Sequence, residues 1–587
     1  MRDRENPKIA TEFLTAVPNE SHQGHSRKAS ASQVWYSICL LLAVATYCYA
    51  LDSQYIPKNG DEFEYMHITR LTAASGHLLP LVSQQADMRN TKPPLLFWQG
   101  IASTDWGRSW NLFRLRYPSV LYTLLTSLMA FLLARKWSGQ WHVGVLAAVV
   151  YLSFFNVFRY GRPFLTEAPL MFWTFLPVFI FLFWQLQATE SAVLVPVVMG
   201  TALGFACLYK SFVLVLPVGL ALSWWCLDRR SYHLGPFLKK DVGKIAIIPA
   251  VALALFCGWF LLDPKPAEVF QEFVLRENVG RFDVGSSSYL HYLLRGGSSI
   301  WALAAGFFVN AGLLIFPVCA LVWMRTKERR NWSAEEKFLW IWAASLFLIF
   351  SLPSMRSARY LLPAMPGIAV LGALHWNRIS RKSFVISLLA AAGALGVLVY
   401  LCLLLQFSLG HAALFRWSYW LVVSITILAV VCGLIVRDFT RPAVPAVALL
   451  LCLCLALALR PLDGALGQFN ASTQHDVEGK QVWVPCNFRA VDEGYRFLLP
   501  GADVACYSDD KTATLDSLKQ RYPLFAYGQP LSAPDPAGLR VVGERLKLRG
   551  RHTNRELLDM LRGNVFQQLF LREILLEVPA PGNSDRP

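Results

Sequence analysis

Residues 60–99 read GDEFEYMHITRLTAASGHLLPLVSQQADMRNTKPPLLFWQ, and this stretch lies between two long apolar segments. It opens with three acidic side chains, Asp61, Glu62 and Glu64, and it closes with Lys92 and two prolines. Lipid solvates neither charges nor open backbone, so a charged stretch between two membrane-crossing segments has to lie at the membrane surface. The stretch therefore predicts a polar site held against a membrane.

The composition of the whole chain indicates a helical membrane protein. Of its 587 residues, 55% are hydrophobic and only 16% are charged. The apolar residues form blocks of about 20, the length of a membrane-crossing helix, and they do not alternate as barrel strands do. The net charge of +16 does not indicate nucleic-acid binding, because the basic residues lie in short loops between the blocks, as the positive-inside rule expects.

The pattern predicts an all-α polytopic membrane domain followed by a small extracytoplasmic α/β domain. About thirteen spans are expected, near residues 34–52, 117–134, 142–157, 164–185, 192–207, 211–227, 245–262, 300–324, 338–352, 359–375, 384–406, 417–436 and 442–459. Amphipathic helices at 64–75 and 93–102 are expected to lie in the membrane interface.

Domain boundaries follow from shifts in composition. We expect a disordered cytoplasmic tail at 1–33, the transmembrane domain at 34–460, the α/β domain at 461–577 and a disordered tail at 578–587. Basic loops recur on alternate sides of the spans, which places the N-terminus in the cytoplasm. An odd number of spans then puts the first loop, 53–116, and the α/β domain on the opposite face.

Two of the 12 cysteines, Cys486 and Cys506, follow predicted strands of the outer domain, and the others lie in or beside apolar spans. In an oxidising compartment these two either pair or remain free thiols, and the spacing favours neither. No spacing of Cys and His resembles a zinc site.

The carboxylates Asp61 and Glu167 are the catalytic candidates. A carboxylate beside an apolar surface has its charged form destabilised, which suits it to accept a proton from a hydroxyl. Glu167 lies at the mouth of an apolar segment, where a charge is costly unless it is paired or functional. The alternatives are that Asp61 and Glu62 only stabilise a helix start, and that Glu167 only pairs with Arg162.

Several polar side chains map near the same outer face and are the substrate-binding candidates. Cations gathered at headgroup depth suit a phosphate carried on a lipid, whereas some of them would serve only as anchors that reach the interface. These candidates are Glu62, Lys92, Arg159, Arg162, Lys210, Arg281, Arg356, Arg359 and Tyr360.

Seven short motifs between about residues 52 and 374 resemble, in their order, those of the protein O-mannosyltransferases and aminoarabinose transferases. These are GT-C membrane glycosyltransferases. The motifs are DE at 61–62, KPP at 92–94, RLRYP at 114–118, RPFLTE at 162–167, YKS at 209–211, RENVGRF at 276–282 and SMRSARYLLPAMP at 354–366.

The resemblance implies an inverting transfer of one sugar from a polyprenyl (undecaprenyl) phosphate carrier to lipid A or another envelope glycan. It places the protein in a bacterial inner membrane, with the α/β domain in the periplasm. By position, Asp61 matches the family's essential loop aspartate and Glu167 its second outer carboxylate. Lys92 matches the lysine that holds the carrier phosphate, and Tyr360 a neighbour of that phosphate. If the acceptor is itself a phosphate, no base is needed, and Asp61 would orient groups or bind the sugar.

The sequence departs from the aminoarabinose transferases at their zinc site. The two zinc-ligand positions hold Thr91 and Asn278, so we expect no metal cofactor, and Glu64 replaces an arginine. Three alternatives remain: transfer to Ser or Thr hydroxyls, a transporter or flippase for lipid-linked sugars, and a non-catalytic scaffold. Transporters usually bind near the membrane midplane, whereas these charges gather at one outer edge.

Overall fold

The structure is a computed structural model that describes residues 22–57, 60–85, 88–184, 190–282, 289–410, 414–464, 466–510, 513–550 and 552–579. The side chains of 22–32, 281, 282, 290 and 292 lie outside this description. Most of the expected tails, residues 1–21 and 580–587, also lie outside it.

Each apolar block that the sequence predicts as a span is helical. The helices are α1 (His22–Cys48), α4 (Leu112–Ser138), α5 (Trp141–Leu152), α7 (Glu167–Phe183), α9 (Leu194–Tyr209), α10 (Val215–Arg229), α12 (Val242–Leu262), α15 (Ile300–Val309) with α16 (Ile315–Lys327), α17 (Ala334–Ser351), η6 (Ala358–Ala364) with α18 (Met365–Leu374), α19 (Arg381–Ser408), α20 (Trp417–Ile435) and α21 (Thr440–Leu459). Helix α1 begins at residue 22, eleven residues before residue 33, the expected end of the N-terminal tail.

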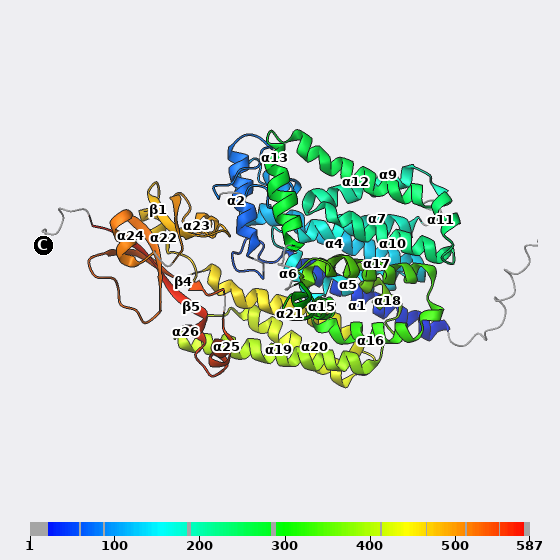
Figure 1. The fold of residues 1–587 in the computed structure, drawn as a ribbon. Coiled ribbons are helices and arrows are strands. Elements are labelled where there is room, and N and C mark those ends of the chain that lie inside the picture. The colour runs from blue at the N-terminus through cyan, green and yellow to red at the C-terminus, as the bar shows by residue number, and fades with distance from the viewer. Residues whose placement is uncertain are drawn as a thin grey trace, which may run out of the picture.

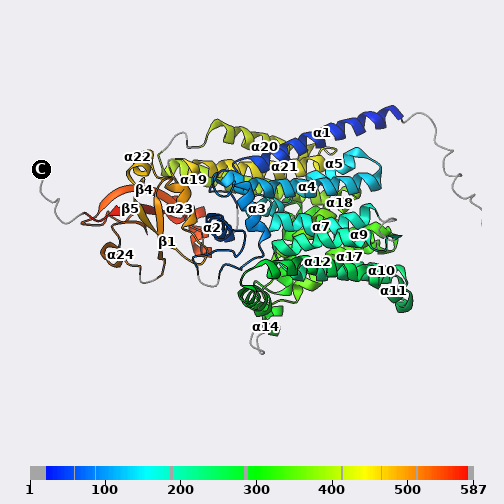
Figure 2. The same cartoon turned by 90° about the horizontal axis from the view of Figure 1, so that it is seen from above.

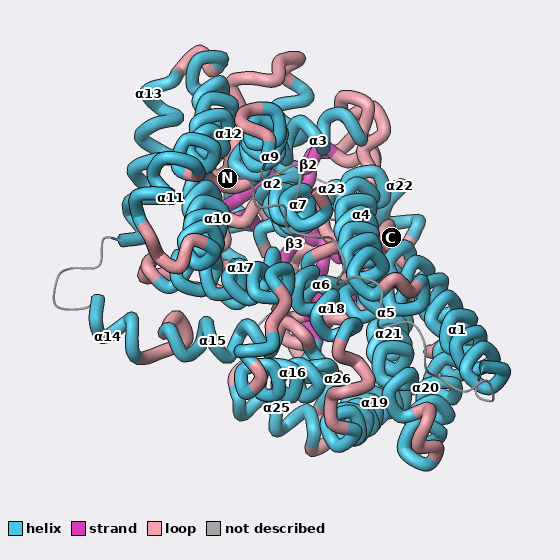
Figure 3. Tube along the Cα trace, turned by 90° about the vertical axis from the view of Figure 1, so that its right-hand side faces the viewer, coloured by secondary structure: helices cyan, strands magenta, loops and turns pink. Residues whose placement is uncertain are grey.

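Length and composition distinguish these helices further. Within the described ranges, six segments are long and apolar enough to cross a membrane, and the pair α15 and α16, bent by 102°, would be a seventh. Figure 3 looks along the bundle, with α9, α10 and α12 on one side and α1, α19 and α20 on the other. The chain is therefore a multi-span helical membrane protein.

Local sequence explains where α4 begins and ends. The Asn111 side chain accepts a hydrogen bond from the backbone N–H of Arg114, which satisfies one unpaired donor of the first turn. The helix ends at Gly139, whose φ of 67° is a left-handed conformation that glycine adopts without a steric penalty.

Short helices connect the spans on both faces. They are α2 (Asp61–Ala74), α3 (Leu95–Ser103), α6 (Phe155–Tyr160), η1 (Phe212–Leu214), α11 (Leu234–Lys240), α13 (Pro266–Val269), the π-helix η2 (Phe270–Asn278), η3 (Val279–Phe282), α14 (Tyr289–Leu294), η4 (Gly312–Leu314), η5 (Arg329–Asn331) and η7 (Arg460–Asp463). Eight of the 14 residues of α2 are buried, and α2 lies between the bundle and the C-terminal domain (Figure 2). More than half of its residues therefore pack inside the protein, and its place in the membrane interface stays a prediction.

The C-terminal domain is a five-stranded mixed sheet with short helices, at one end of the helical bundle (Figure 1). The strands run in the order β2-β1-β3-β5-β4, with β1 parallel to β2 and β3, and β5 antiparallel to β3 and β4. Its elements are α22 (Ala471–Asp476), β1 (Gln481–Cys486), α23 (Glu493–Leu498), β2 (Asp503–Ser508), α24 (Leu515–Arg521), β3 (Leu524–Gln529), β4 (Arg540–Leu548), α25 (Asn554–Leu561), α26 (Val565–Leu569) and β5 (Phe570–Glu577). Cys486 and Cys506 form a disulfide between neighbouring strands, so of the two alternatives the structure has the paired one.

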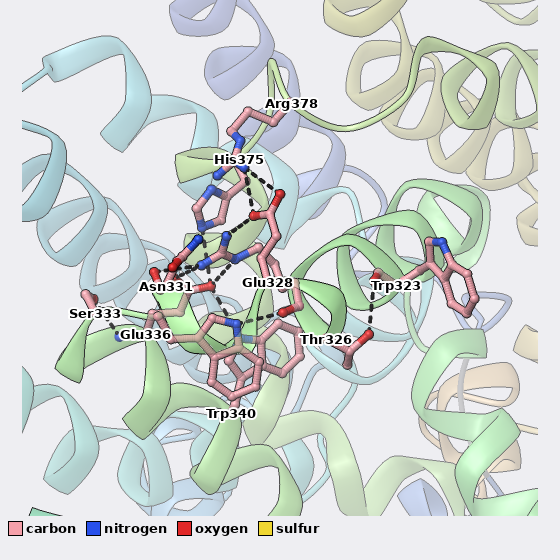
Figure 4. Close-up of polar contacts among 11 residues, drawn as sticks. Trp323, Thr326, Glu328, Asn331, Ser333, Glu336, Trp340, His375 and Arg378 are labelled. Carbon is pink, nitrogen blue, oxygen red and sulfur yellow. Dashed lines mark hydrogen bonds and ion pairs between the residues drawn. The ribbon is translucent and has the colours of Figure 1, made fainter.

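A polar network, buried at Arg325 and Glu336 and exposed at Arg378, joins α16, α17 and the residues after α18 (Figure 4). Arg325, at the end of α16, donates two hydrogen bonds of 2.6 and 2.7 Å to the carboxylate of Glu336 on α17. Arg378 donates to both oxygens of Glu328, and His375 lies 3.4 Å from Glu336. These contacts join the ends of α16, α17 and α18.

Candidate active site

A cavity of ≈ 310 Å³ lies where α2, α7 and η6 meet below the C-terminal domain. Six of the residues predicted from sequence line it, and they include both catalytic candidates. They are Asp61, Lys92, Glu167, Lys210, Arg359 and Tyr360. The wall also contains Glu64, Tyr65, Glu277, Asn278 and Phe488.

Asp61 and Glu167 are joined through one guanidinium group. Nη1 of Arg359 lies 3.2 Å from Oδ2 of Asp61 and 3.4 Å from Oε1 of Glu167. Lys210 donates from Nζ to the same Oε1 of Glu167 at 3.0 Å. The Asp61 side chain is 25% exposed and that of Glu167 only 2%, so of these two carboxylates Asp61 is the more accessible to a ligand in the cavity.

Helix ends position these four side chains. Asp61 is the first residue of α2 and Glu167 the first of α7, where the helix dipole favours a negative charge. Lys210 directly follows α9, and Arg359 is the second residue of η6. Asp61 thus does sit at a helix start, as the alternative interpretation of Asp61 and Glu62 held, and it also faces the cavity.

Lys92 stands elsewhere on the cavity wall. Its Nζ donates to the Thr91 carbonyl oxygen at 2.6 Å, lies 3.8 Å from Oε2 of Glu277, and lies 5.9 Å from the centre of the Tyr65 ring. Lys92 therefore brings a positive charge to the cavity wall, close to Glu277.

Two acidic residues bring additional negative charge to the cavity. Burial raises the pKa of Glu64 above its usual 4.5, although the positive charge of Lys92 acts in the opposite direction. Glu277 is a site residue that sequence reasoning missed, although it lies within the RENVGRF motif. Phe488 carried no sequence signal, because it reaches the cavity from the C-terminal domain.

The residues at the family's zinc positions do not fit a zinc ion. Thr91 offers a neutral hydroxyl. The Asn278 amide accepts from Ser211 Oγ at 2.7 Å and donates to the Phe273 carbonyl oxygen at 2.7 Å. Zinc sites use thiolates, imidazoles and carboxylates, so this pair supplies none of the usual ligands.

Glu62 lies outside the cavity in a buried ion pair with Arg116. Arg116 donates from Nε to Oε1 at 2.7 Å and from Nη2 to Oε2 at 2.8 Å, and both side chains are fully buried. Oε1 also accepts from the backbone N–H of Phe164 at 2.8 Å. Glu62 therefore ties α2 to α4 and to the turn that precedes Glu167.

Three other predicted cations do not line the cavity. Arg162 donates to the carbonyl oxygens of Tyr47 and Tyr49, and Arg356 to those of Ser351 and Ser298. Arg159 lies against the ring of Tyr160, 5.3 Å from its centre. The fourth, Arg281, has a side chain outside the described part of the chain. Arg162 thus pairs with backbone carbonyls, not with Glu167 as the alternative had it.

A second acidic cluster joins α2 to the C-terminal domain. Glu493 lies 3.0 Å from Nδ1 of His67, and Arg70 donates from Nε to its two oxygens at 3.0 and 3.1 Å. Burial alone would raise the pKa of Glu493, but hydrogen bonds from His67 and Arg70 hold it at about 2. Nε2 of His67 accepts from the Gln84 N–H at 3.2 Å, so both ring nitrogens are engaged within the protein.

Known families share the sequence pattern of this chain. The family model described as dolichyl-phosphate-mannose-protein mannosyltransferase matches residues 35–267. Undecaprenyl phosphate-alpha-4-amino-4-deoxy-L-arabinose arabinosyl transferase 2 from Proteus mirabilis is 25% identical over 81% of this chain and 86% of its own. The corresponding transferase from Photorhabdus laumondii is 25% identical over 58% of this chain and 59% of its own.

A solved structure shares the fold. The crystal structure of ArnT from Cupriavidus metallidurans bound to undecaprenyl phosphate matches 94% of this chain and 99% of its own, with a TM-score of 0.62 and 17% sequence identity. The apo structure of the same protein gives a TM-score of 0.57. Residues 35–267 thus match the protein mannosyltransferase family model, and the chain is similar in sequence to the aminoarabinose transferases and in fold to ArnT.

Proposed function

We propose that this glycosyltransferase takes one sugar from an undecaprenyl phosphate carrier and transfers it, with inversion, to an acceptor on the outer face of a bacterial inner membrane. One observation carries the proposal: Asp61 and Glu167 share Arg359 in a cavity that also contains Lys92 and Lys210. The relatives are named for an undecaprenyl phosphate-linked donor, and the ArnT structure contains undecaprenyl phosphate.

The cations suit the leaving group. As the bond between the anomeric carbon and the phosphate oxygen breaks, negative charge grows on the carrier phosphate. Lys92 and Arg359 stand on the cavity wall to stabilise that charge, and Lys210 holds Glu167 in place. The ammonium group of Lys210 lies over the ring of Tyr360, with Nζ 5.2 Å from the ring centre.

Asp61 suits the acceptor. An acceptor hydroxyl that attacks the anomeric carbon loses its proton, and the partly exposed Asp61 carboxylate is positioned to take it. The products are then the glycosylated acceptor and the free carrier phosphate. With a phosphate acceptor, as on lipid A, Asp61 instead orients the sugar. Lipid A or another envelope glycan is the proposed acceptor, with Ser and Thr hydroxyls as the second candidate.

We infer thirteen crossings, with the N-terminus in the cytoplasm and the C-terminal domain in the periplasm. Support comes from the basic ends of α4, α10 and α16, which lie opposite the helix ends that carry the cavity. Labelling of single cysteines placed at Ser472 and at Arg329 tests this. Labelling of Ser472→Cys by an impermeant reagent, with Arg329→Cys protected, is expected, and the reverse would refute it.

The activity is tested with the purified protein in vesicles, given undecaprenyl phosphate-linked sugars and lipid A, with products identified by mass spectrometry. Asp61→Asn is expected to lower transfer by about 10²–10⁴-fold with a hydroxyl acceptor. Asp105→Asn is the matched control, because Asp105 lies in the same outer loop with an exposed side chain. Full transfer by Asp61→Asn would remove Asp61 from the mechanism, and movement of intact carrier without bond cleavage would favour a transporter.

A further inference from the structure

A second groove lies at the far end of the helices that carry the active-site cavity. It has a volume of ≈ 300 Å³ and is bounded by α7, α9, α10 and α12. Glu167 begins α7 at the cavity, whereas Phe181, near the end of α7, lines the groove. Figure 1 shows the neighbouring α11 at the end of the bundle away from the sheet domain.

The groove combines apolar walls with a basic rim. Met199, Leu222 and Trp225 line its depth, and three basic side chains but only one acidic side chain stand around it. Such a combination suits an amphiphile with a negatively charged head, because the chain is buried while the head meets cations.

The acidic side chain is already committed to a partner. Arg230 donates to both oxygens of Asp241, at 3.1 and 3.2 Å. The rim also contains Arg229, which lies 4.9 Å from the centre of the Trp225 ring, and Lys244. A zwitterionic headgroup would find its phosphate partners here but no uncommitted carboxylate for its ammonium group.

The segment beside the groove has the character of a membrane-surface helix. Leu234 and Leu238 of α11 are 63% and 61% exposed, and Lys239 and Lys240 follow directly. Exposed leucines next to lysines are expected where a short helix lies at the boundary between headgroups and acyl chains. The groove therefore opens at the level of lipid headgroups.

We propose that this groove binds an anionic phospholipid of the leaflet opposite the catalytic cavity. The headgroup phosphate contacts Arg229 and Lys244, and an acyl chain packs against Met199, Leu222 and Trp225. The lipid holds together the ends of α9, α10 and α12; at their other ends, Lys210 directly after α9 and Leu214 directly before α10 line the active-site cavity. The site is separate from that of the sugar donor, so its test does not depend on the proposed transfer reaction.

The test is native mass spectrometry of the purified protein with phosphatidylglycerol and, separately, phosphatidylcholine of the same acyl chains. Wild type is expected to prefer phosphatidylglycerol. The double variant Arg229→Gln with Lys244→Gln is expected to bind it about twenty-five-fold more weakly, from about fivefold for each basic residue. The double variant Arg329→Gln with Arg330→Gln is the control, because these exposed arginines lie at the same end but not on the groove.

Equal binding of the two lipids, or an equal loss in the control variant, would overturn the proposal. Competition by glycerol phosphate as strong as by the intact lipid would also overturn it, since that result indicates a site for free phosphate. The conservative double variant Arg229→Lys with Lys244→Arg is expected to keep binding within about threefold. Its recovery separates loss of charge from loss of fold.

Discussion

Asp61 and Arg359 are 298 positions apart in the sequence, yet Nη1 of Arg359 lies 3.2 Å from Oδ2 of Asp61. The same nitrogen lies 3.4 Å from Oε1 of Glu167, so Arg359 is the point at which the starts of α2 and α7 are joined to η6. A ligand phosphate that enters the cavity meets a guanidinium already held in place by two carboxylates.

Replacement of Arg359 tests this junction. Arg359→Gln is expected to lower kcat/KM for the donor by about 10²–10³-fold, the usual cost of losing a group that stabilises charge in the transition state. Arg108→Gln serves as the control, because Arg108 is a 78% exposed side chain on the same outer loop. A variant with unchanged kcat/KM and normal folding would remove Arg359 from the proposed mechanism.

The pair of Glu62 and Arg116 is expected to support folding without taking part in the reaction. Glu62→Gln leaves the fully buried Arg116 without its counter-charge, which typically costs about 3–5 kcal/mol in the free energy of unfolding. Thermal unfolding in detergent measures the loss. Replacing both residues with methionine is expected to recover most of it. A stable Glu62→Gln protein that has lost only donor binding would instead assign Glu62 to the substrate.

Gly306 on α15 is expected to control the position of η6. A Cβ added at Gly306 would lie 2.6 Å from Cβ of Ala358, the residue before Arg359, so η6 would have to move. Since a shift of about 1 Å can cost a hundredfold in rate, we expect Gly306→Ala to lower kcat/KM by about tenfold or more. Gly393→Ala on α19 is the matched control, because an added Cβ there meets nothing within 4 Å. Equal activity of the two variants would contradict this role.

Donor binding is expected to weaken as pH rises. Burial raises the pKa of Glu64 above 4.5, so Glu64 is neutral at low pH and becomes negative as pH rises through that raised value. The new charge beside Lys92 repels the carrier phosphate, so KM for the donor should increase with pH. Glu64→Gln is expected to flatten that increase in steady-state assays. An identical pH profile in the variant would show that ionisation of Glu64 does not affect donor binding.

Glu493 differs from Glu64 because its pKa is lowered in the folded protein, not raised. Its pKa is held at about 2, below the usual 4.5, so its contribution to stability is present above pH 4.5 and is lost as pH falls toward 2. Glu493→Gln should therefore reduce the acid dependence of thermal unfolding. Glu478→Gln, at an exposed position in the same domain, is the control.

Four features were predictable from the amino-acid sequence alone. They are the membrane class, the helical blocks, the strands that begin near 481 and 503, and the cavity residues that lie within recognisable motifs. These properties depend on local composition, since bilayer thickness sets the length of an apolar helix and charge at its end marks an interface. Local patterns therefore identified these residues as candidates, and six of them line one cavity.

Which charged side chains face that cavity depends on how distant segments of the chain pack together, and this was not predictable from the sequence. Arg116 and Arg359 each directly precede a tyrosine in a basic motif. Arg116 is nevertheless buried against Glu62, whereas Arg359 contacts Asp61. Phe488 joins the site only because the sheet domain packs over α2. The partner of a charged side chain depends on which distant helix packs beside it. No local sequence pattern encodes that packing.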